Sequence, residues 1–385
     1  MATARGATGG MSVSEAPAAA GRSDAVRLVR VSSLHAGAQR LRRGWDDHWI
    51  AIGARRAAPA VLAQIDAPEA RGWAAAGAQV SEAGVVMLFV GRPGERPAAV
   101  LKIATTAEAR RSLRHEGNVL GALHDDPRLG GWTGMLPRPI AEGQVDGKPY
   151  VLTRYVVGRS AASIAREPAA AERVQRTAAD AIGELHRRTA VTTRIEDADL
   201  DRWLWRSPVV LRAAAPALGA RRTARALDRL CDAVRATLIG RSVTTGWTHG
   251  DFWLGNVLVT ADGSVATGIV DWDLAGAGEL PIVDLLHLIA YSRRLAERRD
   301  LGLVVREMLK GGAWRKGELS LLRAEGGDDP DAAYVRASLV LYWLRHVAGN
   351  LTQSERYARN RLWLRRNVDP IVAFCGDGPK PEVLP

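Results

Sequence analysis

The sequence predicts an α+β fold of two lobes, in which a small lobe rich in strands precedes a larger lobe that is mostly helical. The first indication is a series of short apolar runs between residues 84 and 157, separated by turn residues. The second is apolar side chains at helical spacing over Glu172–Arg188 and Ala220–Ile239. The length of 385 residues suits one two-lobed unit or two ordinary domains.

Composition limits the class of protein. The apolar fraction of 47% is typical of a globular chain. Cys231 and Cys375 match no metal or redox spacing, which favours a reduced, cytoplasmic compartment. No apolar run approaches the roughly 18 to 20 residues that a membrane helix needs, and we expect no secretory signal. The net charge of +11 would permit binding to nucleic acid, but the arginines are spread along the chain and indicate a solvated surface.

The chain begins with two segments that precede the small lobe. Residues 1–24 are rich in Ala, Gly and Ser without apolar periodicity, so we expect a disordered tail. Residues 25–71 become globular in composition and form a prefix whose role the sequence does not reveal.

The small lobe is predicted over residues 72–157. Gly84–Gly91 and Ala98–Ala104 read as paired strands, and Thr106–His124 as a helix. Lys102 is a lone amine in an apolar strand, so it is either a solubility device on an edge strand or an anchor for phosphate. Glu116 lies on the following helix, where a glutamate taken by itself indicates an exposed ion pair.

The stretch Trp247–Asp273 gives the most direct indication of function. Asp251 lies in a tight turn just after the end of a predicted strand, and Gly250 gives the backbone of this turn its conformational freedom. Asn256 opens a β-branched run, and an Asp-Gly turn leads into a second strand that ends at Asp271. The hairpin therefore brings Asn256 and Asp271 together, and their oxygen atoms suit Mg²⁺ with phosphate.

This pattern resembles the catalytic core of the aminoglycoside phosphotransferase and choline kinase family, whose fold is protein-kinase-like. The family pattern is His-Gly-Asp, four residues, Asn, and a hairpin to an Ile/Val-Asp-Trp/Phe motif. It stands here as His249-Gly250-Asp251, Asn256 and Ile269-Val270-Asp271-Trp272-Asp273.

The resemblance implies roles for these residues. Asp251 would be the catalytic base, while Asn256 and Asp271 would hold Mg²⁺. Asp273 would either assist a second metal ion or hydrogen-bond the loop. The supporting residues would be His249, which props the loop, and Asp284, which ties a helix start to the catalytic loop.

The resemblance also implies a nucleotide site in the small lobe. Lys102, held by Glu116, would contact the α and β phosphates. Ser81, in the stretch Ala76–Gly84, would meet phosphate, although a plain β-turn explains that stretch equally well. Backbone groups of Thr153 and Tyr155, in the predicted strand Pro149–Val157, would bind the adenine ring, unless this strand is simply buried.

The large lobe is predicted over residues 158–385. Trp203 and Trp205 would line a substrate pocket or belong to the core. Asp329 is expected to cap a helix, within an acidic cluster that either receives a cationic sugar or only caps that helix. Two helices, Asp331–Val347 and Thr352–Asn367, are expected to close the chain.

The function implied is transfer of the γ-phosphoryl group of ATP or GTP to a hydroxyl of a small molecule. A sugar, an amino alcohol and an aminoglycoside-like antibiotic all remain open as acceptors. The His-Gly-Asp turn and the missing activation segment disfavour a protein kinase. Two alternatives stay open: a weakly catalytic nucleotide-binding pseudokinase or scaffold, and a basic nucleic-acid-binding protein, although no nucleic acid is expected as a partner. The sequence does not give the oligomeric state.

Overall fold

Five antiparallel strands form a sheet in the order β1-β2-β3-β5-β4. In the computed structural model, the described residues are 52–376 apart from 82, 205, 215–218, 311–313, 327–330 and 354. The strands of the sheet are β1 (Ala74–Val80), β2 (Val85–Gly91), β3 (Ala99–Ala104), β4 (Pro139–Val145) and β5 (Lys148–Arg154). The apolar run of β2 and the run around Lys102 therefore pair as the sequence predicts.

Lys102 lies at the centre of this sheet. Its strand, β3, pairs with β2 on one side and β5 on the other. The interpretation of Lys102 as a solubility device on an edge strand is therefore wrong, because an edge strand has one neighbour only.

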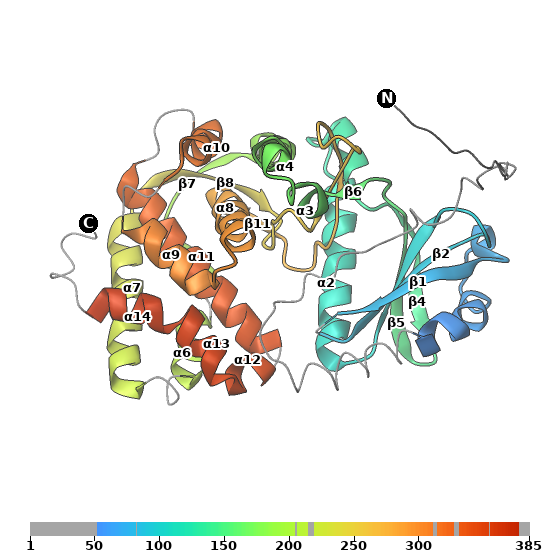
Figure 1. The fold of residues 1–385 in the computed structure, drawn as a ribbon, viewed down its shortest axis with the longest axis horizontal. Helices are drawn as coiled ribbons and strands as arrows, with labels where there is room; N and C mark the ends of the chain where they lie inside the picture. Colours follow the sequence, from blue (N-terminus) through green and yellow to red (C-terminus); the bar gives the residue numbers. More distant parts are fainter. Residues whose placement is uncertain are drawn as a thin grey trace, which may run out of the picture. The chain divides into compact units, whose positions relative to one another are not determined.

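The two faces of the sheet are covered by different segments (Figure 1). Helix α2 (Ala107–His124) packs on one face, where Leu113 belongs to the same apolar cluster as Val85 and Val151. A helix over residues 52–62 and the short 3₁₀ helix η1 (Pro68–Ala70) cover the other face. Leu62 and Ile65 pack there with Leu88 and Leu101. Side chains alternate along a strand, so Lys102 faces α2 while Leu101 faces the N-terminal segment.

This packing gives a role to part of the N-terminal prefix. Residues 52–71 contribute to the apolar core of the small lobe, which the sequence did not reveal. The tail predicted over residues 1–24 lies outside the described residues.

Helix α2 begins where the sequence predicts. Thr106 is its N-cap, and its hydroxyl accepts a hydrogen bond from the Ala109 amide at 3.0 Å. The apolar residues Leu113, Leu120 and Leu123 recur at helical spacing and are buried. Glu116 lies on this buried face rather than on the solvent side.

Two smaller sheets follow the first. The order β10-β9-β6 joins β6 (Arg159–Ser160), β9 (Val257–Val259) and β10 (Ala266–Ile269). The order β11-β8-β7 joins β7 (Val191–Arg194), β8 (Ser242–Thr248) and β11 (Gly276–Glu279). The predicted hairpin after Asn256 is thus present as β9 and β10.

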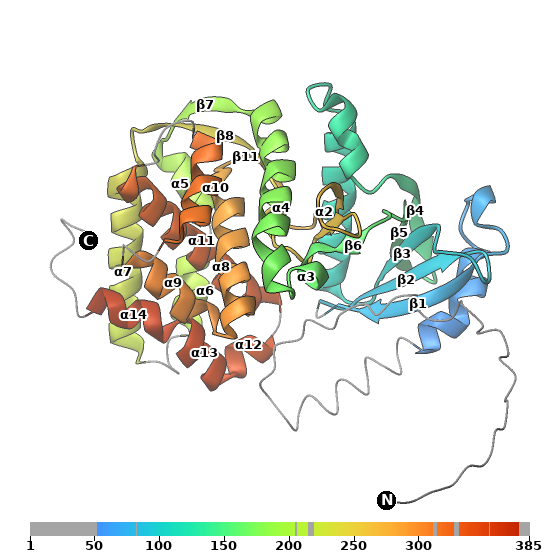
Figure 2. The same ribbon diagram turned by 45° about the horizontal axis from the view of Figure 1, so that its top comes forward.

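Helices form most of the remaining chain (Figure 2). They are η2 (Gly130–Met135), α3 (Ala161–Ile164), α4 (Pro168–Thr189), α5 (Asp197–Leu204), α6 (Ser207–Ala214), α7 (Ala220–Leu238), α8 (Ile282–Glu297), α9 (Leu301–Leu309), α10 (Lys316–Gly326) and α11 (Ala332–Gln353). Helices α8 and α11 pack against each other in the centre of a large apolar core. Trp203 is buried in this core, so it does not line a pocket; Trp205 lies outside the described residues.

The end of the chain differs from the prediction of two helices. Helix α11 runs to Gln353, and three short helices follow, α12 (Glu355–Arg359), α13 (Arg361–Asn367) and α14 (Asp369–Gly376). The side chain of Asn360 caps α13 through the Trp363 amide at 3.0 Å, which starts a new helix inside the predicted one. Asp328 and Asp329 of the acidic cluster lie outside the described residues, while Asp331 pairs with Arg241.

The predicted α+β class with two lobes is confirmed. The five-stranded sheet and α2 form the small lobe, most of the remaining helices form the large lobe, and all of the described residues belong to the same compact unit of the chain. Within the described part, no helix has both the length and the apolar character required to cross a membrane.

Candidate active site

Lys102 is held by a carboxylate pair from two directions. Its Nζ lies 2.7 and 2.8 Å from the two carboxylate oxygens of Glu116 on α2. The same Nζ lies 3.1 Å from Oδ1 of Asp271, which follows β10 in the large lobe. Burial opposes the charge on Lys102, but these two carboxylates raise its pKa above the ordinary range. The ammonium is therefore fixed at the junction of the two lobes.

The pair of Lys102 and Glu116 settles the alternative left open for Glu116. Its side chain is only 6% exposed, so it is not a surface ion pair. Its Oε1 also accepts a hydrogen bond from the backbone amide of Trp272 at 3.4 Å. The helix therefore links the ammonium to the segment that carries Asp271.

The loop after β8 is shaped by Asp284. Its two carboxylate oxygens accept the backbone amides of His249 at 2.7 Å and Gly250 at 2.9 Å. Asp284 stands in the first turn of α8 and is fully buried. It ties the start of this helix to the loop.

Gly250 is required by the backbone of the same loop. Its φ of +79° lies in the left-handed region, and a Cβ there would lie 2.1 Å from the carbonyl oxygen of Leu274. A residue with a side chain would displace the neighbouring segment.

His249 holds the loop through backbone groups. Its Nδ1 accepts the amide of Asp251 at 3.3 Å, so its Nε2 carries the proton and donates to the carbonyl of Val270 at 3.0 Å. The ring is fully buried, and burial lowers its pKa. A neutral ring that links two backbone segments fits the predicted structural role.

Asp251 and Asn256 are in direct contact. The amide nitrogen of Asn256 donates to the backbone carbonyl of Asp251 at 2.9 Å and to its Oδ2 at 3.2 Å. The side chain of Asp251 is 28% exposed, so a ligand can reach it. Burial, and next the charge of Asp271, raises the pKa of Asp251 to about 7. Such a carboxylate is suited to accept a proton near neutral pH.

Asp271 and Asp273 differ in their surroundings. Asp271 has a φ of +72°, and the charge of Lys102 lowers its pKa against the effect of burial. Asp273 accepts the hydroxyl of Ser112 at 2.7 Å, and burial followed by the charge of Asp271 raises its pKa. Of the two uses predicted for Asp273, the structure contains a hydrogen bond, but to α2 rather than within its own loop.

The oxygen atoms fit a hard dication. The amide nitrogen of Asn256 is bound to Asp251, which leaves its oxygen as the atom that can ligate. The side chain of Asp271 is 49% exposed, so it is accessible although it pairs with Lys102. Carboxylate and amide oxygens are the ligands that Mg²⁺ prefers.

Among the described residues, Ser81, Thr153 and Tyr155 form their hydrogen bonds and strand pairings with other residues of the small lobe. Ala76–Val80 belongs to β1 rather than to a loop, and the amide of Val85 donates to Ser81 Oγ at 3.0 Å within the turn. Thr153 pairs with both Val100 and Pro139, so its backbone lies inside the sheet. The amide of Tyr155 donates to Ala98 at 2.9 Å. Just beyond this strand, the side chain of Val157 is 64% exposed.

Sequence reasoning missed several residues around the site. Ser112 binds Asp273, and His287 on α8 lies 3.5 Å from Asp251. Ser112 lies four residues before Glu116 on the same helix face, which was an available signal. His287 follows Asp284 by three residues, which places both on one face of α8.

The two lobes and the polar cluster that joins them define a kinase for small molecules. The chain belongs to the phosphotransferase enzyme family, whose model matches residues 86–320. No curated protein matches the sequence.

Solved structures of aminoglycoside phosphotransferases share the fold. The GDP complex of wild-type aminoglycoside 2'-phosphotransferase-IIIa is 14% identical, covers 82% of this chain and 96% of that chain, and has a TM-score of 0.50. The gentamicin complex of APH(2'')-IIa is 13% identical to this chain and has a TM-score of 0.50; the match covers 78% of this chain and 94% of that chain. APH(3'')-Id from Streptomyces rimosus is 20% identical to this chain and has a TM-score of 0.46; the match covers 76% of this chain and 97% of that chain. At such identities, likeness to the first two of these structures, whose TM-score is 0.50, shows the fold alone.

Proposed function

We propose that this phosphotransferase moves the γ-phosphoryl group of ATP or GTP to a hydroxyl of a small molecule. The observation that carries the proposal is the series of contacts from Glu116 through Lys102 to Asp271, which links the two lobes. This series supports the proposal because an ammonium beside a carboxylate can supply the charge neutralisation and alignment that nucleotide phosphates need.

In this proposal each side chain has one task. Lys102 draws charge from the α and β phosphates, while Glu116 holds it in place. Asn256 and Asp271 would hold Mg²⁺, and Asp273 would contribute through the oxygen that Ser112 does not bind. When bound, Mg²⁺ neutralises charge on the phosphates.

Asp251 serves as the base in the same proposal. It accepts a hydrogen bond from the acceptor hydroxyl, aligns it and takes its proton as the new bond forms. Asn256 orients one oxygen of this carboxylate, and Asp284 fixes the loop that carries it. The exposed part of Asp251 supports an acceptor that approaches from solvent.

The acceptor is proposed as a class. A sugar, an amino alcohol and an aminoglycoside-like antibiotic all offer the required hydroxyl. Gentamicin and GDP, which the two solved structures above contain, make an aminoglycoside and GTP worthwhile members of a test panel.

The test is transfer of labelled γ-phosphate from ATP and from GTP across a panel of these three acceptor classes. We expect at least one acceptor to be phosphorylated well above the hydrolysis seen without acceptor, and no product from Asp271→Asn. Nucleotide hydrolysis that no acceptor increases, or the same product from Asp271→Asn, would contradict the proposal.

A further inference from the structure

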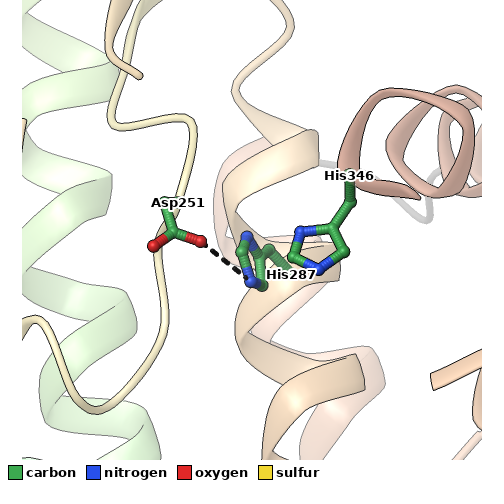
Figure 3. A group of neighbouring side chains, drawn as sticks. All are labelled: Asp251, His287 and His346. Carbon is green, nitrogen blue, oxygen red and sulfur yellow. Dashed lines mark ion pairs between the residues drawn. The ribbon is translucent and has the colours of Figure 1, made fainter. Parts of the chain in front are cut away.

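Two histidines converge on Asp251 from helices of the large lobe (Figure 3). His287 comes from α8 and His346 from α11. Nε2 of His287 lies 3.5 Å from Oδ1 of Asp251. One ligand-capable atom from each of the three side chains lies within 4.8 Å of the others. The cluster therefore joins the loop after β8 to two packed helices.

The cluster contains a polar atom with unmet hydrogen-bonding capacity. Nε2 of His287 is buried, its side chain is 2% exposed, and it has no hydrogen-bond partner within the described part of the chain. The ring of Tyr342 lies 5.2 Å from that of His287, and its buried hydroxyl also has no hydrogen-bond partner within the described part of the chain. Buried polar atoms without partners are costly and uncommon in native proteins. A bound atom between Asp251 and His287 would satisfy the nitrogen.

Both histidines are in the form that ligates a metal ion. Burial lowers the pKa of His287 well below its ordinary value. Burial, and next the charge of Arg294, lowers the pKa of His346 to about 3. Neutral imidazoles keep a free lone pair at physiological pH, so no proton has to be displaced from them.

The rings are held in place by their neighbours. The hydroxyl of Tyr291 lies 3.1 Å from Nε2 of His346, and the Tyr291 ring lies 4.6 Å from that of His287. Contacts of this kind orient ligating histidines in metal sites.

We propose that Asp251, His287 and His346 bind a transition-metal dication, of which Zn²⁺ is the representative. Two imidazoles and one carboxylate form a donor set typical of zinc. Zinc lies about 2.0 to 2.2 Å from each such ligand, so the atoms now within 4.8 Å need only draw closer by small side-chain movements. Mg²⁺ prefers oxygen ligands, so this nitrogen-rich site selects a different ion from Asn256 and Asp271.

Occupation of the site has a consequence for activity that rests on the proposed function. The metal ion would engage the carboxylate of Asp251, which would then be unable to accept the proton of an acceptor hydroxyl. Zn²⁺ is therefore expected to inhibit phosphoryl transfer, and a chelator that removes it is expected to restore transfer.

The test uses Co²⁺ as a spectroscopic probe for the zinc site in the full-length, metal-free protein. We expect one Co²⁺ per chain with the intense visible bands of low-coordinate cobalt, displaced by Zn²⁺ but not by excess Mg²⁺. His287→Gln and His346→Gln should each weaken Co²⁺ binding by at least about tenfold. His124→Gln, a change on α2 outside the cluster, should leave binding unchanged.

Asp271→Asn separates this site from the predicted magnesium ligands, because it should retain the Co²⁺ spectrum. His346 is only partly buried, so His346→Gln carries the test if His287→Gln does not fold. Wild-type Co²⁺ affinity and spectrum in His346→Gln, or no saturable binding by the wild type, would overturn the site.

The spectrum requires no turnover, so the two proposals fail separately. Normal Co²⁺ binding without any phosphoryl transfer would contradict the proposed function and support the metal site. Phosphoryl transfer without saturable Co²⁺ binding would support the proposed function and contradict the metal site.

Discussion

The contact between Lys102 and Glu116 shows how far residue types and order can predict a site. A lysine in an apolar strand and a glutamate on the next helix left alternatives open, and the pair was expected only because the chain resembles a family of kinases. The structure adds that the strand is central and that the glutamate is buried. Neither burial nor strand order can be inferred from residue types alone, because both depend on the packing of distant segments.

The same contact gives a prediction at the residue scale. Lys102→Met should destabilise the protein by about 3–5 kcal/mol, because Glu116 would stay buried without its counter-charge. Lys102→Met combined with Glu116→Gln should recover most of this loss. Urea unfolding of the wild type, both single variants and the double variant measures the coupling. If the two single changes are simply additive, the buried pair is not an energetic unit.

A second prediction concerns Asp251 and pH. Its pKa is about 7 in the folded protein and about 4 in an unfolded chain. Between these values the folded state binds more protons, so the contribution of Asp251 to stability falls as pH rises and is constant above about pH 7. The difference in melting temperature between Asp251→Asn and the wild type should therefore grow in favour of the variant from about pH 4 to 7. Metal-free thermal melts test this, and a difference that does not change with pH would contradict it.

The histidines near Asp251 mark the limit of sequence reasoning at this scale. His287 and His346 stand on apolar helices, where a lone histidine is usually part of the core. Their approach to Asp251 depends on how α8 and α11 pack, and no local pattern records that packing.

At the scale of elements, the hairpin after Asn256 was predictable because its signals are local. The Asp-Gly turn and the β-branched runs specify β9 and β10 without help from the rest of the chain. The bounds of the C-terminal helices were not predictable, because Asn360 interrupts an otherwise helical composition through a single capping hydrogen bond to the Trp363 amide. The packing of residues 52–71 on the sheet was hidden for another reason, since it requires the partner surface to be known.

The loop after β8 gives the prediction at this scale. Gly250→Ala should lower stability and abolish phosphoryl transfer, because a Cβ would meet the Leu274 carbonyl at 2.1 Å and the backbone is left-handed. The matched control is Gly121→Ala on α2, where nothing lies within 4 Å of the new Cβ. That change should stabilise the protein by roughly 0.5–1 kcal/mol. Thermal melts of the two variants should move in opposite directions, and a fully active Gly250→Ala would refute the account of this loop.

For the whole molecule, the salt bridge between Lys102 and Asp271 joins the small lobe to the large one. The bridge uses groups that we propose for phosphate and Mg²⁺, so ligand binding and the contact between the lobes should be linked. Local signals predicted both lobes, whereas their junction depends on contacts between residues far apart in the sequence, such as Lys102 with Asp271 and Ser112 with Asp273.

This linkage predicts the effect of metal removal. Nucleotide with Mg²⁺, at about 100 times its dissociation constant, should stabilise the wild type by about 2.7 kcal/mol. EDTA in the presence of the same nucleotide should remove most of the gain, and Asp271→Asn should show little gain at all. Thermal shift measurements compare these conditions. An undiminished shift after chelation would argue against a metal ion at Asn256 and Asp271.

The most direct test of the central claim compares the wild type with Asp251→Asn in both turnover and nucleotide binding. If Asp251 is the base of a phosphoryl transfer, the variant should transfer phosphate about 10²- to 10⁴-fold more slowly while binding Mg²⁺-nucleotide nearly as well as the wild type. Calorimetry gives the affinity and labelled γ-phosphate gives the rate. Wild-type transfer by a folded Asp251→Asn protein would contradict the account.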